Sequence, residues 1–266
     1  MTNIKEKKFI FISGLHRSGT SWLFRLLKKQ ENISGFSNIG YPEDEGQFIQ
    51  NIFPNSGKLI NPGRFSFYTK MHFTEQSDIS KQGNEIYNNW AKYWDLSKDY
   101  LVEKSPPNLI RMRLLQKMFP NSYFITIIRH PIAVSYATKK WTNDRFLSIL
   151  IKHWIYAHKI YLEDRKYIKN ELCITYEEIK PNAQNIIDKL NSFLGTEIIY
   201  SEKFINKNQF YFDLWNNEYF KGLKAILKNL EKKYLILKYE KELNNFGYSL
   251  IDLEYNNFTN SKYFTN

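Results

Sequence analysis

Cysteine is almost absent from this chain, because Cys173 is the single cysteine among 266 residues. One thiol excludes an internal disulfide and also a metal site built from several cysteines. A protein that relies on no disulfide is suited to a reducing compartment. We therefore expect a cytoplasmic protein without a metal centre.

The chain also lacks a hydrophobic run long enough to cross a bilayer, which takes about 20 apolar residues. Residues 1–8 are charged and lead into a short apolar run that ends at a glycine, with no small-residue cleavage site. From these absences we expect that the protein is not secreted, carries no membrane anchor and does not insert stably into a membrane. No internal repeat, low-complexity linker or long block of charge signals a domain boundary.

The length and composition predict one domain with a substantial core. A chain of 266 residues is slightly longer than the chains that usually fold around one hydrophobic core. We expect a single domain over 1–266, with a nucleotide-binding core at 8–195 and a helical C-terminal extension at 196–266. Hydrophobic residues make up 42% of the chain and aromatic residues 17%, which excludes disorder.

Positive charge is in excess, with 38 Lys and Arg against 27 Asp and Glu and a net charge of +11. Such an excess raises the local concentration of any polyanion, whether nucleic acid, phosphorylated nucleotide or acidic polysaccharide. Charge alone does not choose among them, and general abundance of lysine is an alternative source of the excess. No aromatic RNA-binding motif is visible, so we expect no nucleic-acid partner.

A candidate phosphate-binding loop follows the first apolar run, residues 9–13. Gly14 and Gly19 have the spacing of a Walker loop, which turns backbone N–H groups inward and points the next helix start at an anion. The Walker pattern places Lys after the second glycine, but this chain has Thr20 there, with Arg17 as the cation inside the loop. The loop predicts phosphate binding without the chemistry of an ordinary ATPase. The alternative is a tight turn that binds nothing.

Strand patterns alternate with helix patterns, which predicts an α/β fold with a central parallel sheet flanked by helices, similar to P-loop NTPases. The expected strands are 9–13, 33–36, 100–103, 123–128 and 172–175. The expected helices are 20–29, 84–94, 108–118, 143–169 and 181–194, the last closed by Gly195, with a mostly helical tail over 214–243. We also expect an acidic stretch with helical character at 43–53 and a functional flap in the loop-rich residues 54–80.

Three cationic segments follow predicted strands, at the edge where open parallel sheets bind ligands. The first is the glycine loop. In the second, Lys104 leaves a buried strand ahead of Pro106 and Pro107, although lysines also commonly snorkel from strand ends. In the third, Arg129 follows a buried strand and Ser135 lies in the next helical turn. Arg and Ser make a good phosphate clamp, and the alternative is an arginine that caps carbonyls or pairs with a surface acid.

Together these motifs resemble the sulfotransferases that use 3′-phosphoadenosine 5′-phosphosulfate (PAPS), and the nearest subgroup is bacterial-type. The resemblance covers about residues 8–195 and implies a P-loop-like sulfotransferase fold. It also implies transfer of the sulfuryl group from PAPS to an acceptor hydroxyl. The matching segments are 14–21 for the 5′-phosphosulfate loop, 42–47, 103–107 for the strand-end lysine, 129–135 for the 3′-phosphate clamp, 175–178 and 193–195.

The resemblance also implies which residues bind the donor. It implies that the transfer reaction requires no metal. Fixed cations and amides are sufficient to stabilise the negative charge that develops on the leaving phosphate and the sulfuryl oxygens. Arg17 and Lys104 take this catalytic role. Ser135 lies closer in sequence to Arg129 than the clamp serine does in many members, so Thr138 shares or takes its role. The expected cofactor-binding residues are Gly14, His16, Arg17, Ser18, Gly19, Thr20, Ser21, Arg129, Ser135 and Thr138.

The general base must differ from that of cytosolic members, which place a catalytic His after the lysine segment, where this chain has Pro106. Glu43, Asp44 and Glu45 follow a short strand whose end lies beside the phosphate loop in a parallel sheet. They are equally compatible with a plain charged helix start. His16 lies in the loop, and imidazole ordinarily titrates near neutral pH. We rank Glu43 first, Glu45 second and His16 third.

Two other functions fit parts of the sequence. A nucleotide-dependent small-molecule kinase explains the loop, but the missing Lys and the absence of an apolar strand ending in a metal-binding Asp oppose it. A non-catalytic binder of acidic glycans or nucleic acid explains the charge, but not the cations after three strands. For the acceptor, the resemblance suggests a hydroxyl of a carbohydrate or lipid-linked glycan. We expect the flap at 55–75 and the C-terminal third to recognise it.

Overall fold

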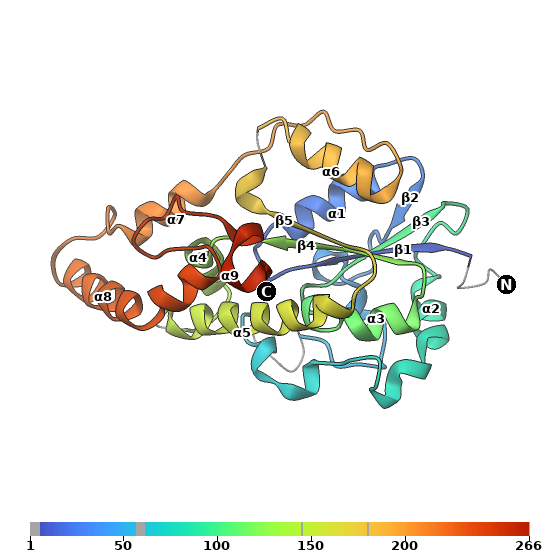
Figure 1. Cartoon of the computed structure of the whole chain (residues 1–266), viewed down its shortest axis with the longest axis horizontal. Helices are drawn as coiled ribbons and strands as arrows, with labels where there is room; N and C mark the ends of the chain where they lie inside the picture. Colours follow the sequence, from blue (N-terminus) through green and yellow to red (C-terminus); the bar gives the residue numbers. More distant parts are fainter. Residues whose placement is uncertain (1–5, 57–61, 145, 180, 266) are drawn as a thin grey trace.

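The computed structural model describes residues 6–56, 62–144, 146–179 and 181–265. Its centre is a parallel five-stranded sheet with the order β2-β3-β1-β4-β5 (Figure 1). The strands are β1 Lys8–Ser13, β2 Ile33–Gly35, β3 Tyr100–Lys104, β4 Ser122–Ile128 and β5 Glu171–Thr175. All five expected strands are present, so the predicted α/β fold with a parallel sheet is confirmed.

The central strand is apolar on both faces, because helices cover the sheet on both sides. Residues 9–12 of β1 are fully buried, as parallel sheets between two helical layers require. Figure 1 shows α1 (Thr20–Lys28) and α6 (Gln184–Leu194) on one side of the sheet. It shows α3 (Met112–Met118) and α5 (Ser148–Asp164) on the other.

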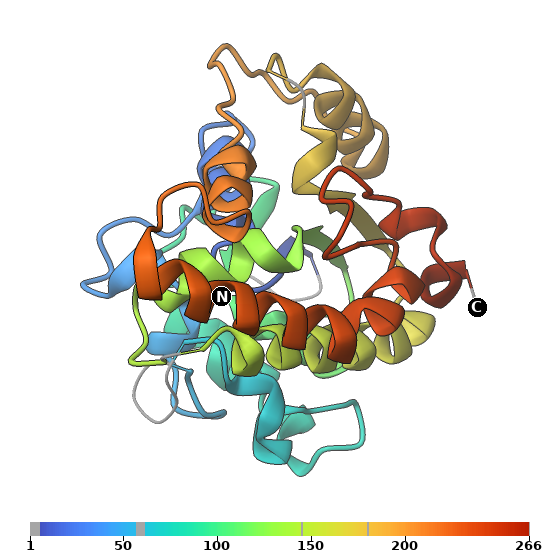
Figure 2. The same cartoon turned by 90° about the vertical axis from the view of Figure 1, so that its left-hand side faces the viewer.

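The remaining helices extend this three-layer arrangement. Helix α8 (Gly222–Asn245) lies on the outside of the molecule, where it crosses the face turned to the viewer in Figure 2. Among the described helices, none is both long and apolar enough to traverse a bilayer. Gly195 ends α6 with a φ of 68°, as predicted. The helices not yet named on the two sides of the sheet are α2 Gly83–Trp90, α4 Pro131–Lys139, α7 Asn208–Trp215, α8 Gly222–Asn245 and α9 Lys262–Thr265.

The acidic stretch 43–53 does not form the expected helix. It forms two short 3₁₀ turns, and Glu43 and Asp44 have left-handed φ angles of 58° and 50°. The backbone N–H of Gly46 donates to Oε1 of Glu103 at 3.0 Å. A side chain from β3 therefore takes a hydrogen bond that a helix would have made along its own backbone.

Other expected helices have different bounds, and three of them differ for an evident physical reason. The one at 108–118 begins as a 3₁₀ turn, Pro106–Ile110, because its two prolines supply no N–H groups, and Arg111 with a φ of −137° separates this turn from α3. The helix expected at 143–169 is confined to α5, which a 3₁₀ turn follows. The tail at 214–243 is split into α7 and α8, since left-handed backbone between them interrupts the helical hydrogen bonds.

The loop-rich segment 54–80 is irregular, as predicted, apart from short 3₁₀ turns in its described part. Residues 57–61 of the expected flap lie outside the described residues. Phe65 and Met71 are buried, so this segment contributes to the core rather than lying loosely on the surface.

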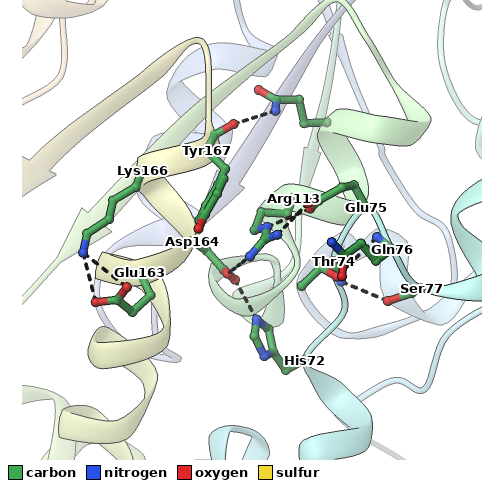
Figure 3. A network of polar contacts seen from close by, with 11 residues as sticks. His72, Thr74, Glu75, Gln76, Ser77, Arg113, Glu163, Asp164, Lys166 and Tyr167 are labelled. Carbon is green, nitrogen blue, oxygen red and sulfur yellow. Dashed lines mark hydrogen bonds and ion pairs between the residues drawn. The ribbon is translucent and has the colours of Figure 1, made fainter.

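A polar network fastens the same segment to α3 and α5 (Figure 3). Arg113 donates to both carboxylate oxygens of Glu75, at 2.7 and 2.6 Å, and its guanidinium lies 4.0 Å from the ring centroid of Tyr167. Nε2 of His72 lies 2.9 Å from Oδ2 of Asp164, and Arg113 lies 3.6 Å from the other oxygen of the same carboxylate. Arg113 thereby joins the loop to both helices.

We expect Gly14→Ala to destabilise the protein much more than Gly195→Ala. Both glycines have a positive φ, +148° and +68°, and a left-handed backbone costs an alanine about 1–2 kcal/mol. An added Cβ on Gly14 would also lie 2.5 Å from the carbonyl oxygen of Ile127, whereas nothing lies within 4 Å at Gly195. Urea unfolding of the two variants measures the difference, and equal losses would contradict the close approach of the loop to β4.

Candidate active site

A cleft of about 330 Å³ opens where β1, β3 and β4 end, at the edge of the sheet that the sequence indicated. Its wall contains eight of the predicted site residues: His16, Arg17, Gly19, Thr20, Ser21, Glu43, Glu45 and Arg129. It also contains residues that were not predicted as parts of the site, among them Trp22, Arg25, Trp141, Tyr176, Tyr200, Lys203 and Lys207.

The loop between β1 and α1 depends on backbone conformations with positive φ. Gly14, Arg17 and Gly19 have φ angles of 148°, 68° and 114°. A left-handed arginine costs about 1–3 kcal/mol and persists only where its surroundings impose it. The hydroxyl of Ser18 donates to the carbonyl of Leu15 at 2.7 Å, so this side chain stabilises the loop from inside.

Helix α1 begins directly after the loop, and its first turn has no side-chain cap. The first N–H groups of a helix have no partner within the helix, and this end carries partial positive charge. Thr20 and Ser21 place their part of the first turn in the cleft wall. A phosphate or sulfate group bound here would take the place of the missing cap.

Arg129 contributes a second cationic position to the cleft. Its Nε donates to Oδ1 of Asn208 at 2.7 Å, and its Nη1 donates to the carbonyl of Arg17 at 2.9 Å. The guanidinium lies over the ring of Tyr176, 3.9 Å from its centroid. Burial lowers the pKa of Arg129, and Tyr176 and Glu177 oppose this shift. Nη2 of Arg129 is buried without a hydrogen-bond partner among the described residues, so one donor is available to an anion.

Glu177 and Asn208 hold Arg129 in place, and neither was predicted as a site residue. Oε1 of Glu177 accepts from Nδ2 of Asn208 at 2.7 Å and from the backbone N–H of His130 at 3.0 Å. Burial raises the pKa of Glu177, while these hydrogen bonds lower it. Glu177 lies in residues 175–178, one of the segments that resemble the family, and this resemblance is the sequence signal for it. Asn208 lies far along the chain, where no sequence pattern connects it to Arg129.

Ser135 and Thr138 do not join Arg129 in the cleft wall. Both side chains adjoin a separate cavity of about 10 Å³, together with His153. The hydroxyl of Ser135 is buried without a partner among the described residues, and the hydroxyl of Thr138 donates to the carbonyl of His16 at 3.5 Å. Because α4 starts immediately after Arg129, its helical phase turns these two residues toward the back of the loop. Neither hydroxyl lines the cleft beside Arg129 in this structure, and the clamp with Ser135 or Thr138 stays a prediction.

Lys104 and Glu45 form a buried ion pair beside the cleft. Nζ of Lys104 lies 2.9 Å from Oε1 of Glu45, and Nε2 of Gln47 donates to Oε2 at 2.5 Å. Lys104 is fully buried and lies behind Glu45, which lines the cleft. Removing one partner of such a pair leaves the other charge uncompensated in a low dielectric. Lys104 thus influences the cleft through Glu45.

Glu103 organises the backbone around this pair. Its Oε1 accepts from the N–H of Gly46 at 3.0 Å and from the hydroxyl of Ser105 at 2.5 Å, and its Oε2 accepts from Nδ2 of Asn108 at 2.6 Å. Asn108 also donates to the carbonyl of Ile12, near the end of β1, at 3.2 Å. Burial raises the pKa of Glu103 to about 7, although the hydrogen bonds from Ser105 and Asn108 oppose the shift. Its place before the strand-end lysine was the sequence signal for this role.

Glu43 and His16 reach the cleft in different electrostatic environments. Partial burial by itself would raise the pKa of Glu43, but the hydroxyl of Ser21 and nearby cations, Lys104 foremost, hold it below its usual value. Burial lowers the pKa of His16, and Lys104 and Arg17 lower it further against the opposing effect of a nearby carboxylate. Both groups are therefore weaker bases than free Glu and His.

Asp44 turns away from the cleft. Its Oδ1 accepts from the N–H of Ile39 at 3.2 Å, and its Oδ2 lies 3.6 Å from Nζ of Lys28. Within the described ranges, no group of three or more His, Cys, Asp or Glu is placed to hold a metal ion.

The parallel sheet, the glycine loop without a Walker lysine and the arginines at the strand ends define a P-loop-like α/β protein with an anion-binding cleft. Residues 10–202 match the model of the sulfotransferase family. This match spans most of the chain, so the protein belongs to the sulfotransferase family and is a transferase of sulfuryl groups. The use of PAPS as co-substrate is characteristic of that family.

Solved structures share the fold. Sulfotransferase STF9 from Mycobacterium avium superposes with a TM-score of 0.51 at 13% identity, over 88% of this chain and 77% of that one. The sulfotransferase domain of the Synechococcus olefin synthase gives 0.50 at 15% identity, over 86% and 95%. At these identities the similarity establishes the fold alone. A comparison with curated protein sequences found no match.

We expect Glu103→Gln to remove a pH dependence from the stability of the protein. The pKa of Glu103 is raised from 4.5 to about 7 on folding, so between these values the folded state binds more protons than the unfolded state. The free energy of unfolding should therefore fall as pH rises through this window, by an amount on the order of 3 kcal/mol from this group. Because glutamine does not titrate, the Glu103→Gln variant should lack this pH dependence of the unfolding free energy.

Urea unfolding at a series of pH values measures this effect. The difference in unfolding free energy between the native protein and Glu103→Gln should change across the window. Glu85→Gln, on an exposed position of α2, is the control. A difference that stays constant with pH would rule out a buried titrating carboxylate at Glu103.

Proposed function

We propose that the cleft binds PAPS and that the protein transfers its sulfuryl group to a hydroxyl of an acceptor. The observation that carries this proposal is the presence of two anion sites in one cleft: the uncapped start of α1 and the unused Nη2 of Arg129. PAPS has anionic groups at both ends of its nucleoside, a 5′-phosphosulfate and a 3′-phosphate. Two separate sites fit such a donor better than a single phosphate-binding loop would.

At the loop, we assign the 5′-phosphosulfate to Arg17 and the amides from Gly19 to Ser21, because the N–H of Ser18 donates to the carbonyl of Leu15 at 3.1 Å. Gly14 and Gly19 allow the backbone its shape. During transfer, negative charge grows on the oxygen between phosphorus and sulfur and on the sulfuryl oxygens. Fixed amides and cations stabilise this charge without reorganising. The guanidinium of Arg17 lies 4.5 Å from the ring centroid of Trp141, a contact that supports its position in the cleft wall.

At the other end, we assign the 3′-phosphate to Arg129, assisted by Lys203 and Lys207, which line the same cleft. Charge-assisted hydrogen bonds from a guanidinium are strong and geometrically specific. ATP has no 3′-phosphate, so this site distinguishes PAPS from ATP. Ser135 and Thr138 face the small cavity behind the loop, and the proposed clamp functions without them.

We propose Glu45 as the general base, ahead of Glu43 and His16. The acceptor oxygen forms a bond to sulfur while the bridging S–O bond breaks, and the acceptor proton passes to Glu45. Protonation neutralises the carboxylate, so Lys104 loses its counter-ion as negative charge develops on the leaving phosphate. The pair would couple proton removal to charge stabilisation. We place Glu45 ahead of Glu43 because Glu45 is the carboxylate that Lys104 contacts directly, so only its protonation releases the lysine charge toward the leaving phosphate.

For the acceptor, we propose a hydroxyl of a carbohydrate or lipid-linked glycan. The sequence resemblance to bacterial-type members supports this class. The aromatic side chains of Trp22, Trp141 and Tyr200 in the cleft wall also support it, because flat apolar faces with polar edges suit a sugar ring.

The donor is tested by ligand-induced stabilisation. The product nucleotide, 3′-phosphoadenosine 5′-phosphate, should stabilise the protein by about 2.7 kcal/mol at about 100 times its Kd, and ATP with Mg²⁺ by much less. Arg129→Ala should abolish most of this difference, because it removes the contact to the 3′-phosphate. Lys166→Ala, an exposed cation on another surface, is the matched control.

Urea unfolding with and without each nucleotide provides the measurement. Equal stabilisation by ATP would favour a kinase. Turnover that a chelator abolishes and Mg²⁺ restores would also count against the proposed chemistry.

The base is tested by kinetics with saturating donor. Glu45→Gln should lower kcat by about 10²- to 10⁴-fold and leave product-nucleotide binding intact, which also shows that the variant is folded. Lys104→Ala should lower kcat as well. Asp44→Asn, whose side chain faces away from the cleft, is the control. Near-full activity of Glu45→Gln and Glu43→Gln, with an inactive His16→Ala that still binds nucleotide, would make His16 the base.

A further inference from the structure

Helix α8 carries an apolar face that is largely exposed among the residues that the structure describes. We call this face the outer stripe. The opposite face of the helix packs on the protein, where Leu235, Tyr239 and Leu243 are buried. The side chains of the outer stripe are between 50% and 90% exposed: Leu223, Ile226, Leu227, Leu230, Tyr234 and Leu237.

The outer stripe follows the helical repeat. Leu223, Leu230 and Leu237 are spaced by seven residues, about two turns, and the other members lie three or four residues from them. From Leu223 to Leu237 the stripe is about 21 Å long at a rise of about 1.5 Å per residue. Helix α8 lies on the outer surface in both views of the molecule (Figures 1 and 2). A continuous apolar band of this length differs from the scattered apolar residues of an ordinary surface.

Lysines border the outer stripe on both sides. At about 100° per residue, Lys224 and Lys238 fall on one flank, Lys233 falls on the other, and Lys241 continues the line of the stripe. Among the described residues, none of these four lysines lies within ion-pair distance of a carboxylate. The charges of these four lysines are therefore not neutralised by ion pairs with any described carboxylate.

The glutamates of α8 are directed to partners within the protein. Oε1 of Glu231 accepts from the N–H of Leu147 at 2.7 Å, and its Oε2 lies 2.6 Å from Nζ of Lys228. Glu240 accepts from Ser249 and from the N–H of Leu250, each at 2.6 Å. Glu242 pairs with Lys159 at 2.6 Å. None of the three carboxylates is left to balance the lysines of the stripe.

We propose that the outer stripe docks the protein on the surface of an anionic lipid bilayer. The leucines enter the boundary between headgroups and acyl chains, Tyr234 lies at the headgroup level, and the bordering lysines contact the anionic headgroups. A helix with an apolar face and a lysine-rich border has the amphipathic pattern that binds in the plane of such an interface. The helix rests on the bilayer and does not cross it.

A second copy of this chain fits the stripe less well. Pairing two outer stripes would bring lysine borders of like charge together, and the stripe offers no exposed carboxylate to compensate them. Its footprint, about 21 Å by the about 10 Å width of a helix, is on the order of 200 Å². A stable protein interface buries about 800 Å² on each partner.

The test is co-sedimentation of the full chain with vesicles. The protein should pellet with vesicles of equimolar phosphatidylcholine and phosphatidylglycerol, and much less with vesicles of phosphatidylcholine alone. The double variant Leu230→Gln/Leu237→Gln should bind at least about tenfold more weakly, because two large apolar side chains are lost from the interface. Ile199→Gln and Ile251→Gln, at residues that are 72% and 68% exposed elsewhere on the surface, should bind like the unaltered protein.

A second variant separates charge from apolar contact. Lys233→Gln/Lys238→Gln should weaken binding to the anionic vesicles about tenfold and reduce its sensitivity to salt, because two of the four lysines are lost. Binding that persists in both double variants would overturn the proposal. Absence of vesicle binding, combined with a dimer in light scattering that Leu230→Gln/Leu237→Gln dissociates, would assign the stripe to a second copy instead.

This inference is independent of the donor site. Every variant of the outer stripe should keep its stabilisation by 3′-phosphoadenosine 5′-phosphate, since α8 contributes no residue to the cleft wall. Loss of vesicle binding with intact nucleotide binding supports the docking role. If the unaltered protein failed to bind the nucleotide, the proposed function would be wrong and the docking role of the outer stripe would be unaffected.

Discussion

The buried ion pair between Lys104 and Glu45 is the contact on which the cleft depends. Lys104 ends a central strand, and Glu45 belongs to a segment of short 3₁₀ turns. Glu103 holds the same segment through the N–H of Gly46. One wall of the cleft is thus fixed by side chains of β3, and a substitution in this group alters both stability and the site because a buried charge cannot lose its partner cheaply.

A second link joins the two anion sites. Nη1 of Arg129 donates to the carbonyl of Arg17, so the cation at the end of β4 supports the left-handed residue of the glycine loop. Asn208 then connects Arg129 to α7, in the C-terminal part of the chain. The glycine loop and Arg129 are therefore joined directly, and the C-terminal part of the chain contributes to a cleft whose main elements lie in the first half of the sequence.

The features that sequence predicted well are local ones. Apolar runs specify β1 and β4, and the spacing of Gly14 and Gly19 indicates the loop before any contact is known. The acidic turn at Glu43 and Glu45 was mistaken for a helix because the groups that shape it, Glu103 and Lys104, are far away in sequence. The role of Asn208 likewise depends on long-range packing, which periodicity does not encode. The orientation of Ser135 follows instead from where α4 begins, and the split of the tail from left-handed backbone between α7 and α8.

Because the start of α1 has no side-chain cap among the described residues, binding of an anion there would make ligand affinity and helix stability parts of one free energy. When a phosphate occupies the helix start, it satisfies amides that elsewhere in proteins are satisfied by a serine or aspartate of the same chain. Helix α1 packs on one face of the sheet, so a phosphate that bound at its start would complete the helix and its release would reverse this. A side chain able to complete that helix by itself would stabilise the resting protein and compete with its own substrate.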